Sequence, residues 1–99
     1  MTKSYREIEA VTKTVGIIKF LSTQKEPVSV LDIAQAVNMP LGTVACHLKT
    51  LEKAEYVRSY GNTFSIGGEL ARIWARQVAV MEGKRDRLDK EIKILKGEY

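Results

Sequence analysis

Two short groups of polar side chains lie near the middle of this 99-residue chain. In the first, a hydroxyl, a thiol and an ammonium group recur every three residues, which places them on one face of a helix. In the second, a guanidinium, a phenol and an amide recur every two residues, as along a strand and into its turn. Such groups can bind phosphate oxygens and the polar edges of bases. The groups are Thr43, Cys46 and Lys49, and then Arg58, Tyr60 and Asn62.

The residue types offer no support for catalysis or for metal binding. Cys46 is the only cysteine and His47 the only histidine, so the chain can form neither an internal disulfide nor a zinc site. The acidic residues alternate with basic ones, as in "MEGKRDRLDKEIK", which is typical of a solvated helix face. No glycine-rich phosphate loop occurs. We therefore expect no enzyme, no cofactor and no metal.

The charge balance modestly favours a polyanionic partner. The net charge is +4 and the pI is about 9.3, with the excess of basic residues divided evenly on the two sides of Gly68. No apolar run is long enough for a membrane span or a signal peptide. We expect a cytoplasmic protein without membrane contact.

Apolar residues at three- and four-residue spacing predict a first helix from about Ser4 to Ser22. Ile17 and Phe20 widen this stripe, so we expect the C-terminal half of the helix to be the better buried. The next segment, "TQKEPVS", breaks the pattern, because Pro27 lacks a donor and disfavours helix at Glu26. The stripe consists of Tyr5, Ile8, Val11, Val15, Ile18 and Leu21.

Two helices joined by a tight break follow. Ser29 and Asp32 form a capping-box-like start, in which the serine hydroxyl accepts from the backbone N–H at the third helical position. This helix ends at Asn38, and the next begins at about Leu41. The inner face of the second helix carries Val44, Leu48 and Leu51. Helix, tight break and helix make a helix-turn-helix.

The segment "VRSYGNTFSI" predicts a β-hairpin with Gly61 and Asn62 at its tip. Gly61 can supply the positive φ that a type II′ turn requires at its first central position. Val57 then pairs with Ile66, and Ser59 with Phe64. One face of the hairpin holds Val57, Phe64 and Ile66, and the other holds Arg58, Tyr60, Thr63 and Ser65. A hairpin directly after a helix-turn-helix is a wing.

Residues 69–96 predict one long helix, roughly 40 Å at about 1.5 Å per residue. Two series spaced by seven residues occupy the a and d positions of more than three heptads, with Arg85 as the one charged member. This seam is longer than a small domain needs for its core, so we expect a partner helix, most simply in a symmetric dimer. The series are Trp74, Met81, Leu88 and Leu95, and Ala71, Val78, Arg85 and Ile92.

The run from Ser29 to Leu70 resembles the N-terminal winged helix-turn-helix of IclR-type bacterial transcriptional regulators. "VTKTVGIIKFLS" in the first helix also fits, so the resemblance covers about two-thirds of the chain. Such regulators usually continue into an effector-binding domain, whereas this chain ends after a helix, so no small-molecule effector is expected. The resemblance is carried by Leu31 to Ala34, Pro40, Thr43, Val44, Leu48, Thr50 to Glu52, Ala54, Tyr56, Val57 and Phe64 to Leu70 with "IGGEL".

The fold expected is mostly α with a small β-hairpin: a winged helix-turn-helix in residues 1–68, then a coiled-coil dimerisation helix in residues 69–99. The resemblance implies a transcriptional regulator that binds double-stranded DNA, and the seam implies a homodimer. We expect DNA contacts from Ser29, Thr43, Cys46, Lys49, Arg58, Tyr60 and Asn62. We expect dimer contacts from Trp74, Val78, Met81, Arg85, Leu88, Ile92 and Leu95.

The second helix of the helix-turn-helix, which begins at about Leu41, is the recognition helix. The residues at its start limit how it could read bases. Leu41, Gly42, Ala45 and Cys46 have little to offer a base edge, so we expect binding through phosphates, the wing and DNA shape. His47 falls where the resembled family tends to have a core leucine, which predicts a partly buried histidine. Alternatively, the apolar surface from Leu41 to Cys46 binds protein, and the winged helix is an interaction or assembly module.

Overall fold

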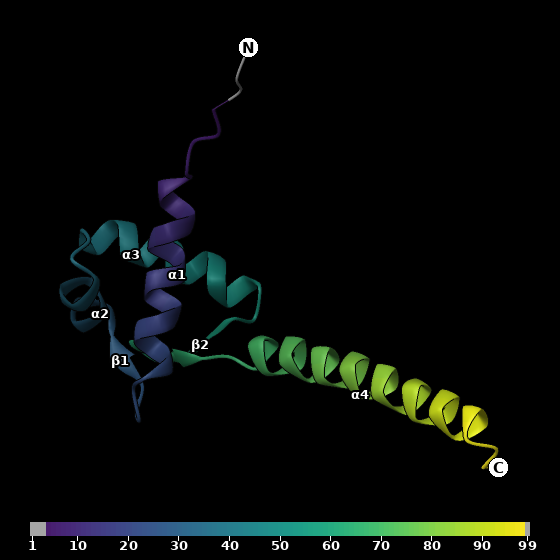
Figure 1. Ribbon diagram of the computed structural model, residues 1–99. Helices are drawn as coiled ribbons and strands as arrows, with labels where there is room; N and C mark the ends of the chain where they lie inside the picture. Colours follow the sequence, from purple (N-terminus) through teal and green to yellow (C-terminus); the bar gives the residue numbers. More distant parts are fainter. Residues whose placement is uncertain (1–3, 99) are drawn as a thin grey trace. The chain divides into compact units, whose positions relative to one another are not determined.

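The helices and strands follow one another in the order of a winged helix-turn-helix in the computed structural model, which describes residues 4–98 (Figure 1). The elements are α1 (Glu9–Ser22), β1 (Val28–Ser29), α2 (Val30–Val37), α3 (Leu41–Lys53), β2 (Val57–Tyr60), β3 (Thr63–Ile66) and α4 (Glu69–Leu95). Contacts divide the chain into two units, one ending at Gly68 and the other beginning at Glu69. The predicted fold class is confirmed: a mostly helical winged helix-turn-helix with a small antiparallel sheet precedes a long C-terminal helix.

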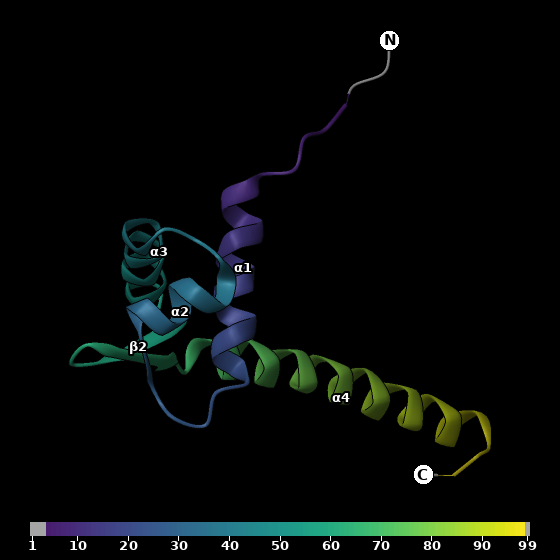
Figure 2. The same cartoon turned by 90° about the vertical axis from the view of Figure 1, so that its left-hand side faces the viewer.

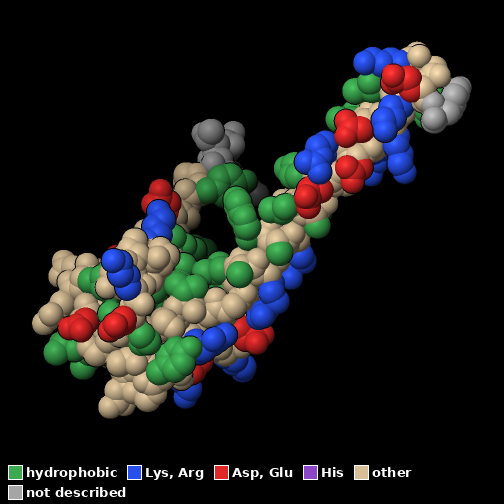
Figure 3. Space-filling view, turned by 90° about the horizontal axis from the view of Figure 1, so that it is seen from below, with side chains coloured by type: hydrophobic (Ala, Val, Ile, Leu, Met, Phe, Trp, Pro, Cys, Tyr) green, Lys and Arg blue, Asp and Glu red, His purple; other side chains and the backbone are tan. Residues whose placement is uncertain are grey.

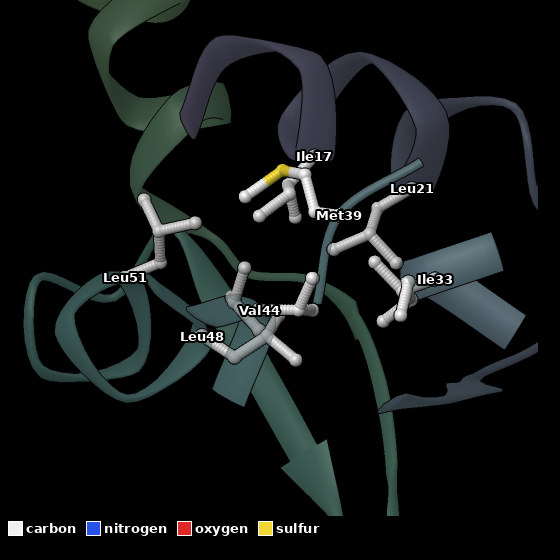
Figure 4. Packing of buried hydrophobic residues seen from close by; sticks show 9 residues of the cluster. Ile17, Leu21, Ile33, Met39, Val44, Leu48 and Leu51 are labelled. Carbon is white, nitrogen blue, oxygen red and sulfur yellow. The ribbon is translucent and has the colours of Figure 1, made fainter. Parts of the chain in front are cut away.

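The core of the first unit forms where α1, α2 and α3 converge (Figure 4). The inner face predicted for α3 is confirmed, because Val44, Leu48 and Leu51 are all buried. Full burial of an aliphatic side chain stabilises a fold by about 1.5–3 kcal/mol, so this cluster holds α3 firmly against its neighbours. The buried residues are Ile17, Leu21, Ile33, Ala34, Met39, Val44, Leu48, Leu51 and Val57.

The first helix starts later than its apolar pattern predicts. α1 begins at Glu9, so the predicted start at about Ser4 is wrong. Ile8 occupies the N-cap without a side-chain hydrogen bond, and Tyr5 and Ile8 are 89% and 67% exposed. Amphipathic helices gain most of their stability from tertiary packing, and this segment has no core to pack against.

Only the end of the predicted apolar stripe faces the core. Ile17 and Leu21 are buried, which confirms that the C-terminal half of α1 is the better packed half. Val11 and Val15, by contrast, are exposed. The three- and four-residue spacing therefore identified the helix but combined two different faces of it.

The helix-turn-helix has the capping groups that the sequence predicts. Ser29 is the N-cap of α2, and its Oγ accepts a hydrogen bond of 3.1 Å from the backbone N–H of Asp32. At the other end Asn38 adopts a left-handed φ of 54°, which asparagine tolerates better than most residues. Met39 in the turn is buried, and α3 then begins at Leu41 as expected.

The wing has the predicted register. β2 and β3 pair antiparallel, with Val57 opposite Ile66 and Ser59 opposite Phe64. Gly61 at the tip has a φ of 61°, the positive value that the two-residue turn requires. The turn and the pairing therefore follow from the sequence of this segment alone.

A third strand, β1, is absent from the sequence prediction. It pairs antiparallel with β3, so the sheet order is β1-β3-β2 and β3 lies in the centre. A two-residue strand is too short to show alternation. All four residues of β3 are half-buried, although only Thr63 and Phe64 pair with β1. In β2, Val57 is buried, and Arg58 and Tyr60 are exposed.

The backbone after β3 passes directly over the end of α3 at Gly67. A Cβ at this position would lie 2.4 Å from the carbonyl oxygen of Glu55. Glu55 itself has a left-handed φ of 65°, and the N–H of Tyr56 donates back to Leu51 O at 2.9 Å, as is common at a helix end. The N–H of Gly67 donates to Tyr56 O at 2.9 Å. Close backbone approach explains the glycine in "IGGEL".

The second unit is α4, and none of its residues is buried. In its first turn the Glu69 carboxylate accepts hydrogen bonds from Arg72 Nε at 2.9 Å and Arg76 Nη2 at 3.2 Å, which lower the pKa of Glu69. A carboxylate near a helix N-terminus is also favoured by the helix dipole. Over residues 4–98, no helix combines the length and the apolar character needed to cross a bilayer.

Gly67→Ala should destabilise the first unit by about 2–3 kcal/mol, because the new methyl group would strike main-chain atoms that cannot move aside cheaply. Gly16→Ala is the matched control: a Cβ there meets nothing within 4 Å, and alanine favours helix by up to about 1 kcal/mol. Thermal unfolding followed by circular dichroism measures both. Equal melting temperatures for the two variants would contradict the close approach at Gly67.

Candidate nucleic-acid interface

The exposed face of α3 carries three of the predicted DNA-binding residues. Cys46 and Lys49 are exposed and Thr43 is half-buried. The opposite face of the helix is fixed by the buried side chains of Val44 and Leu48. Burial on one side therefore determines which polar groups α3 offers on the other.

The wing presents two predicted residues that are bonded to each other. Arg58 Nη1 donates a hydrogen bond of 3.4 Å to Tyr60 Oη, and this bond raises the pKa of the Arg58 guanidinium. Both side chains lie on the exposed face of β2, and Asn62 is exposed at the tip. Figure 2 shows the hairpin extending from its unit with the tip turned away from α1.

The N-terminus of α2, the start of α3 and the wing tip surround one shallow hollow. The structure thus brings together Ser29 and Asn62, two predicted residues that are distant in sequence. Leu31 and Leu41, which are 55% and 52% exposed, make part of its lining apolar. The full lining is Ser29, Val30, Leu31, Leu41, Gly61, Asn62 and Phe64.

His47 is half-buried between α3 and α1, as predicted, and contacts a residue that the sequence did not single out. Its Nδ1 lies 2.6 Å from Thr14 Oγ1, which also donates a hydrogen bond of 2.8 Å to Ala10 O. A hydroxyl has one hydrogen, so a Thr14 that donates to Ala10 O must accept from His47, and we infer that the neutral ring carries its proton on Nδ1. This bond ties the recognition helix to α1.

Cys46 lies apart from the hollow that holds Ser29 and Asn62. It lines a second hollow together with Thr14, His47 and Thr50. Although Cys46 and His47 are neighbours, residues 4–98 contain no group of three or more His, Cys, Asp or Glu that could hold a metal ion.

A further hydrogen bond joins the recognition helix to the wing. Ser59 Oγ on β2 donates to Glu52 Oε2 on α3. Nothing in the sequence pattern pairs these two residues, because they meet only once β2 has folded back beside α3. The bond helps to hold the base of the wing in a fixed place relative to the exposed face of α3.

The predicted dimerisation residues form an exposed series on α4. Hydrophobic side chains recur along this helix between charged ones (Figure 3). Trp74 is 73% exposed and Leu95 is 87% exposed, and the other hydrophobic members are between 41% and 58% exposed. The series is Trp74, Val78, Met81, Arg85, Leu88, Ile92 and Leu95, all of them exposed.

Comparison with known proteins agrees with this description. The IclR helix-turn-helix domain family matches residues 10–60, a stretch that runs from α1 through α3 to the end of β2. No curated protein sequence is significantly similar to the chain.

Solved structures with the same fold include two bacterial proteins. An IclR transcriptional regulator from Alicyclobacillus acidocaldarius is 24% identical, with a TM-score of 0.68 over 73% of this chain and 30% of that chain. HmgR from Pseudomonas aeruginosa is 22% identical, with a TM-score of 0.61 over 70% of this chain and 29% of that chain. The chain therefore spans less than a third of the length of either protein, and the likeness concerns the fold.

Thr14→Val should cost about 1 kcal/mol of unfolding free energy, because the half-buried His47 loses its hydrogen-bond partner. Thr12→Val, at an exposed position of the same helix, should be close to neutral. Nitrogen NMR of the imidazole should find the neutral His47 ring protonated on Nδ1 in the wild type and no longer held in that tautomer in Thr14→Val. A wild-type ring protonated on Nε2 would contradict the assigned direction of the bond.

Proposed function

The chain belongs to the IclR helix-turn-helix family, and on this premise we propose that it binds double-stranded DNA as a dimeric transcriptional regulator. The family consists of DNA-binding transcription regulators and not of enzymes. The exposed polar face of α3 beside the wing carries the proposal, because this surface combines a helix with a projecting hairpin. Since the chain spans 30% of the length of the first regulator, the proposal draws on no property of the rest of that protein.

In this proposal α3 enters the major groove, which is wide enough for one helix. Thr43 can use its hydroxyl on a phosphate or base and its methyl on thymine, while Lys49 is suited to a phosphate. A Cβ at Gly42 would meet no atom within 4 Å, so the first turn of α3 is slim and lets the backbone come close to DNA. With few base-reading groups, sequence preference depends mainly on DNA shape.

The wing and the start of α2 supply the remaining contacts. Arg58 and Tyr60, already bonded to each other, can reach phosphates together, while Asn62 at the tip can reach the minor groove or backbone. Ser29 caps α2, and the helix N-terminus beside it favours a phosphate. The hollow between Ser29 and Asn62 supports a single continuous binding surface.

We assign dimerisation to α4, whose apolar seam is exposed along the whole helix. An unpaired heptad seam of this length is covered most simply by the same helix of a second copy. Two copies would then present two α3 helices to two half-sites on one duplex. Cys46, in the second hollow, would contribute at most a weak contact at the edge of the DNA surface.

A protein-interaction role for the same surface is the second candidate. The exposed Leu31 and Leu41 beside the wing tip favour it, because DNA contacts make little use of such side chains. The triple variant Thr43→Ala, Lys49→Ala and Arg58→Ala separates the two functions: a DNA binder loses its affinity for a duplex, whereas an adaptor retains its protein partner.

Binding to a mixed-sequence duplex should weaken about a hundredfold when salt rises from about 50 to about 200 mM, if two copies each place Lys49 and Arg58 on phosphates. Lys49→Ala and Arg58→Ala should each weaken binding about tenfold and flatten the salt dependence. Fluorescence anisotropy of a labelled duplex measures both effects. Lys90→Ala removes the same charge from α4 and should change little. Absence of binding by folded protein at low salt, or an equal loss in the Lys90 variant, would overturn the proposal.

A further inference from the structure

The charged residues that flank the apolar seam of α4 indicate in which orientation the α4 helix of a second copy would pair with it. With Ala71 at position a and Trp74 at position d, the e and g positions lie at the two borders of the seam. From residue 82 to residue 96, five of these positions hold a full charge, and all five are exposed. They are Lys84 and Glu91 at g and Glu82, Asp89 and Lys96 at e, with Lys96 directly after the last residue of α4.

We propose that the α4 helices of two copies pair in parallel and in register, a refinement that rests on the dimer of the proposed function. In such a pair each g residue meets the next e residue of the other helix. Lys84 then faces the partner's Asp89, and Glu91 faces the partner's Lys96. Both contacts occur twice by symmetry, and each joins opposite charges.

The antiparallel alternative makes the opposite use of the same residues. Full overlap of the seam would place Ala71 opposite the partner's Leu95, so that g faces g and e faces e. Lys84 would then meet the partner's Lys84, and Glu82 would meet the partner's Glu82. Like charges beside a buried seam disfavour a pairing, so the border charges select the parallel arrangement.

Arg85 is the one charged residue inside the seam, and its local contacts fit this arrangement. Its Nη2 lies 3.9 Å from Glu82 Oε2 and its Nε lies 3.8 Å from Asp86 Oδ1. In a parallel pair, the two Arg85 side chains face each other in one layer of a positions. The carboxylates of Glu82 and Asp86 compensate the charge of these side chains, while the aliphatic stems of the arginines can still pack. A single charged a position also disfavours shifted registers, because a shift would set it against apolar layers.

Parallel pairing has a consequence for the whole dimer. It sets the two Glu69 ends together, so both units that end at Gly68 are attached to the same end of the paired helices. Antiparallel pairing would attach them to opposite ends, roughly 40 Å apart at about 1.5 Å per residue. A parallel α4 pair therefore suits binding to two neighbouring half-sites on one face of a duplex.

Disulfide trapping distinguishes the two orientations in the full chain. Cys46 is an exposed free thiol and is first removed by Cys46→Ser. In this background Leu95→Cys should form a covalent dimer in a glutathione redox buffer, because parallel d positions meet across the seam. Lys90→Cys, on the outer face of the helix, is the matched control and should stay largely uncrosslinked.

Mixing an Ala71→Cys chain with a Leu95→Cys chain completes the test. Parallel pairing yields disulfides between identical chains, whereas antiparallel pairing joins position 71 to position 95, since its two 95 positions are about 36 Å apart. A dimer by sedimentation that crosslinks only between 71 and 95, or at neither position, overturns the parallel orientation but not the dimer. A monomer at all concentrations overturns both.

Asp89→Lys gives an independent readout without a new thiol. In the parallel pair it sets two lysines against each other on both borders, so self-association should weaken about tenfold. The double variant Lys84→Glu and Asp89→Lys exchanges the two charges and should restore it. Unchanged association of the single variant is the result expected for antiparallel helices, where position 89 faces the partner's Ala75.

Discussion

The burial of Val44, Leu48 and Leu51 is the constraint on which the rest of the first unit depends. These three side chains fill the space between α1, α2 and β2, and they allow α3 only one rotation about its axis. That rotation sends Lys49 outward and leaves Thr43 at the edge of the exposed face. The buried residues of α3 therefore determine which polar groups the helix exposes on its opposite face.

The links from α3 to its neighbours make the exposed face a rigid surface. One link is the hydrogen bond between His47 and Thr14 on α1, and another is the bond from Ser59 on β2 to Glu52. Gly67 adds a close backbone contact at the end of α3. Because each link joins a different element to the same helix, α3 and the wing hold a fixed mutual position, as simultaneous contact with a groove and a backbone requires.

Local sequence signals predicted the elements that short-range rules govern. The Ser29 cap, the helix end at Asn38 and the hairpin tip at Gly61 each depend on residues a few positions apart, and each is found in the structure. The hairpin register follows in turn, since a two-residue loop leaves one pairing. The same locality explains why α1 was predicted too long: periodicity reports helical spacing but not where the core ends.

Contacts between distant segments could not be predicted in this way. β1 exists because Val28 reaches the free edge of β3, and the polar partner of His47 comes from another helix. The hollow that joins Ser29 to Asn62 likewise depends on the finished fold. For the site, the sequence thus supplied the candidate side chains, while the structure supplied their grouping.

We propose that α3, the wing and the start of α2 form one DNA-binding surface. Backbone amide NMR of the protein titrated with a short duplex tests it most directly. We expect the largest shift changes in residues 29–31, 41–50 and 58–63, with α4 affected little. Changes confined to the outer face of α1 or to α4, with α3 and the wing unperturbed, would contradict the account.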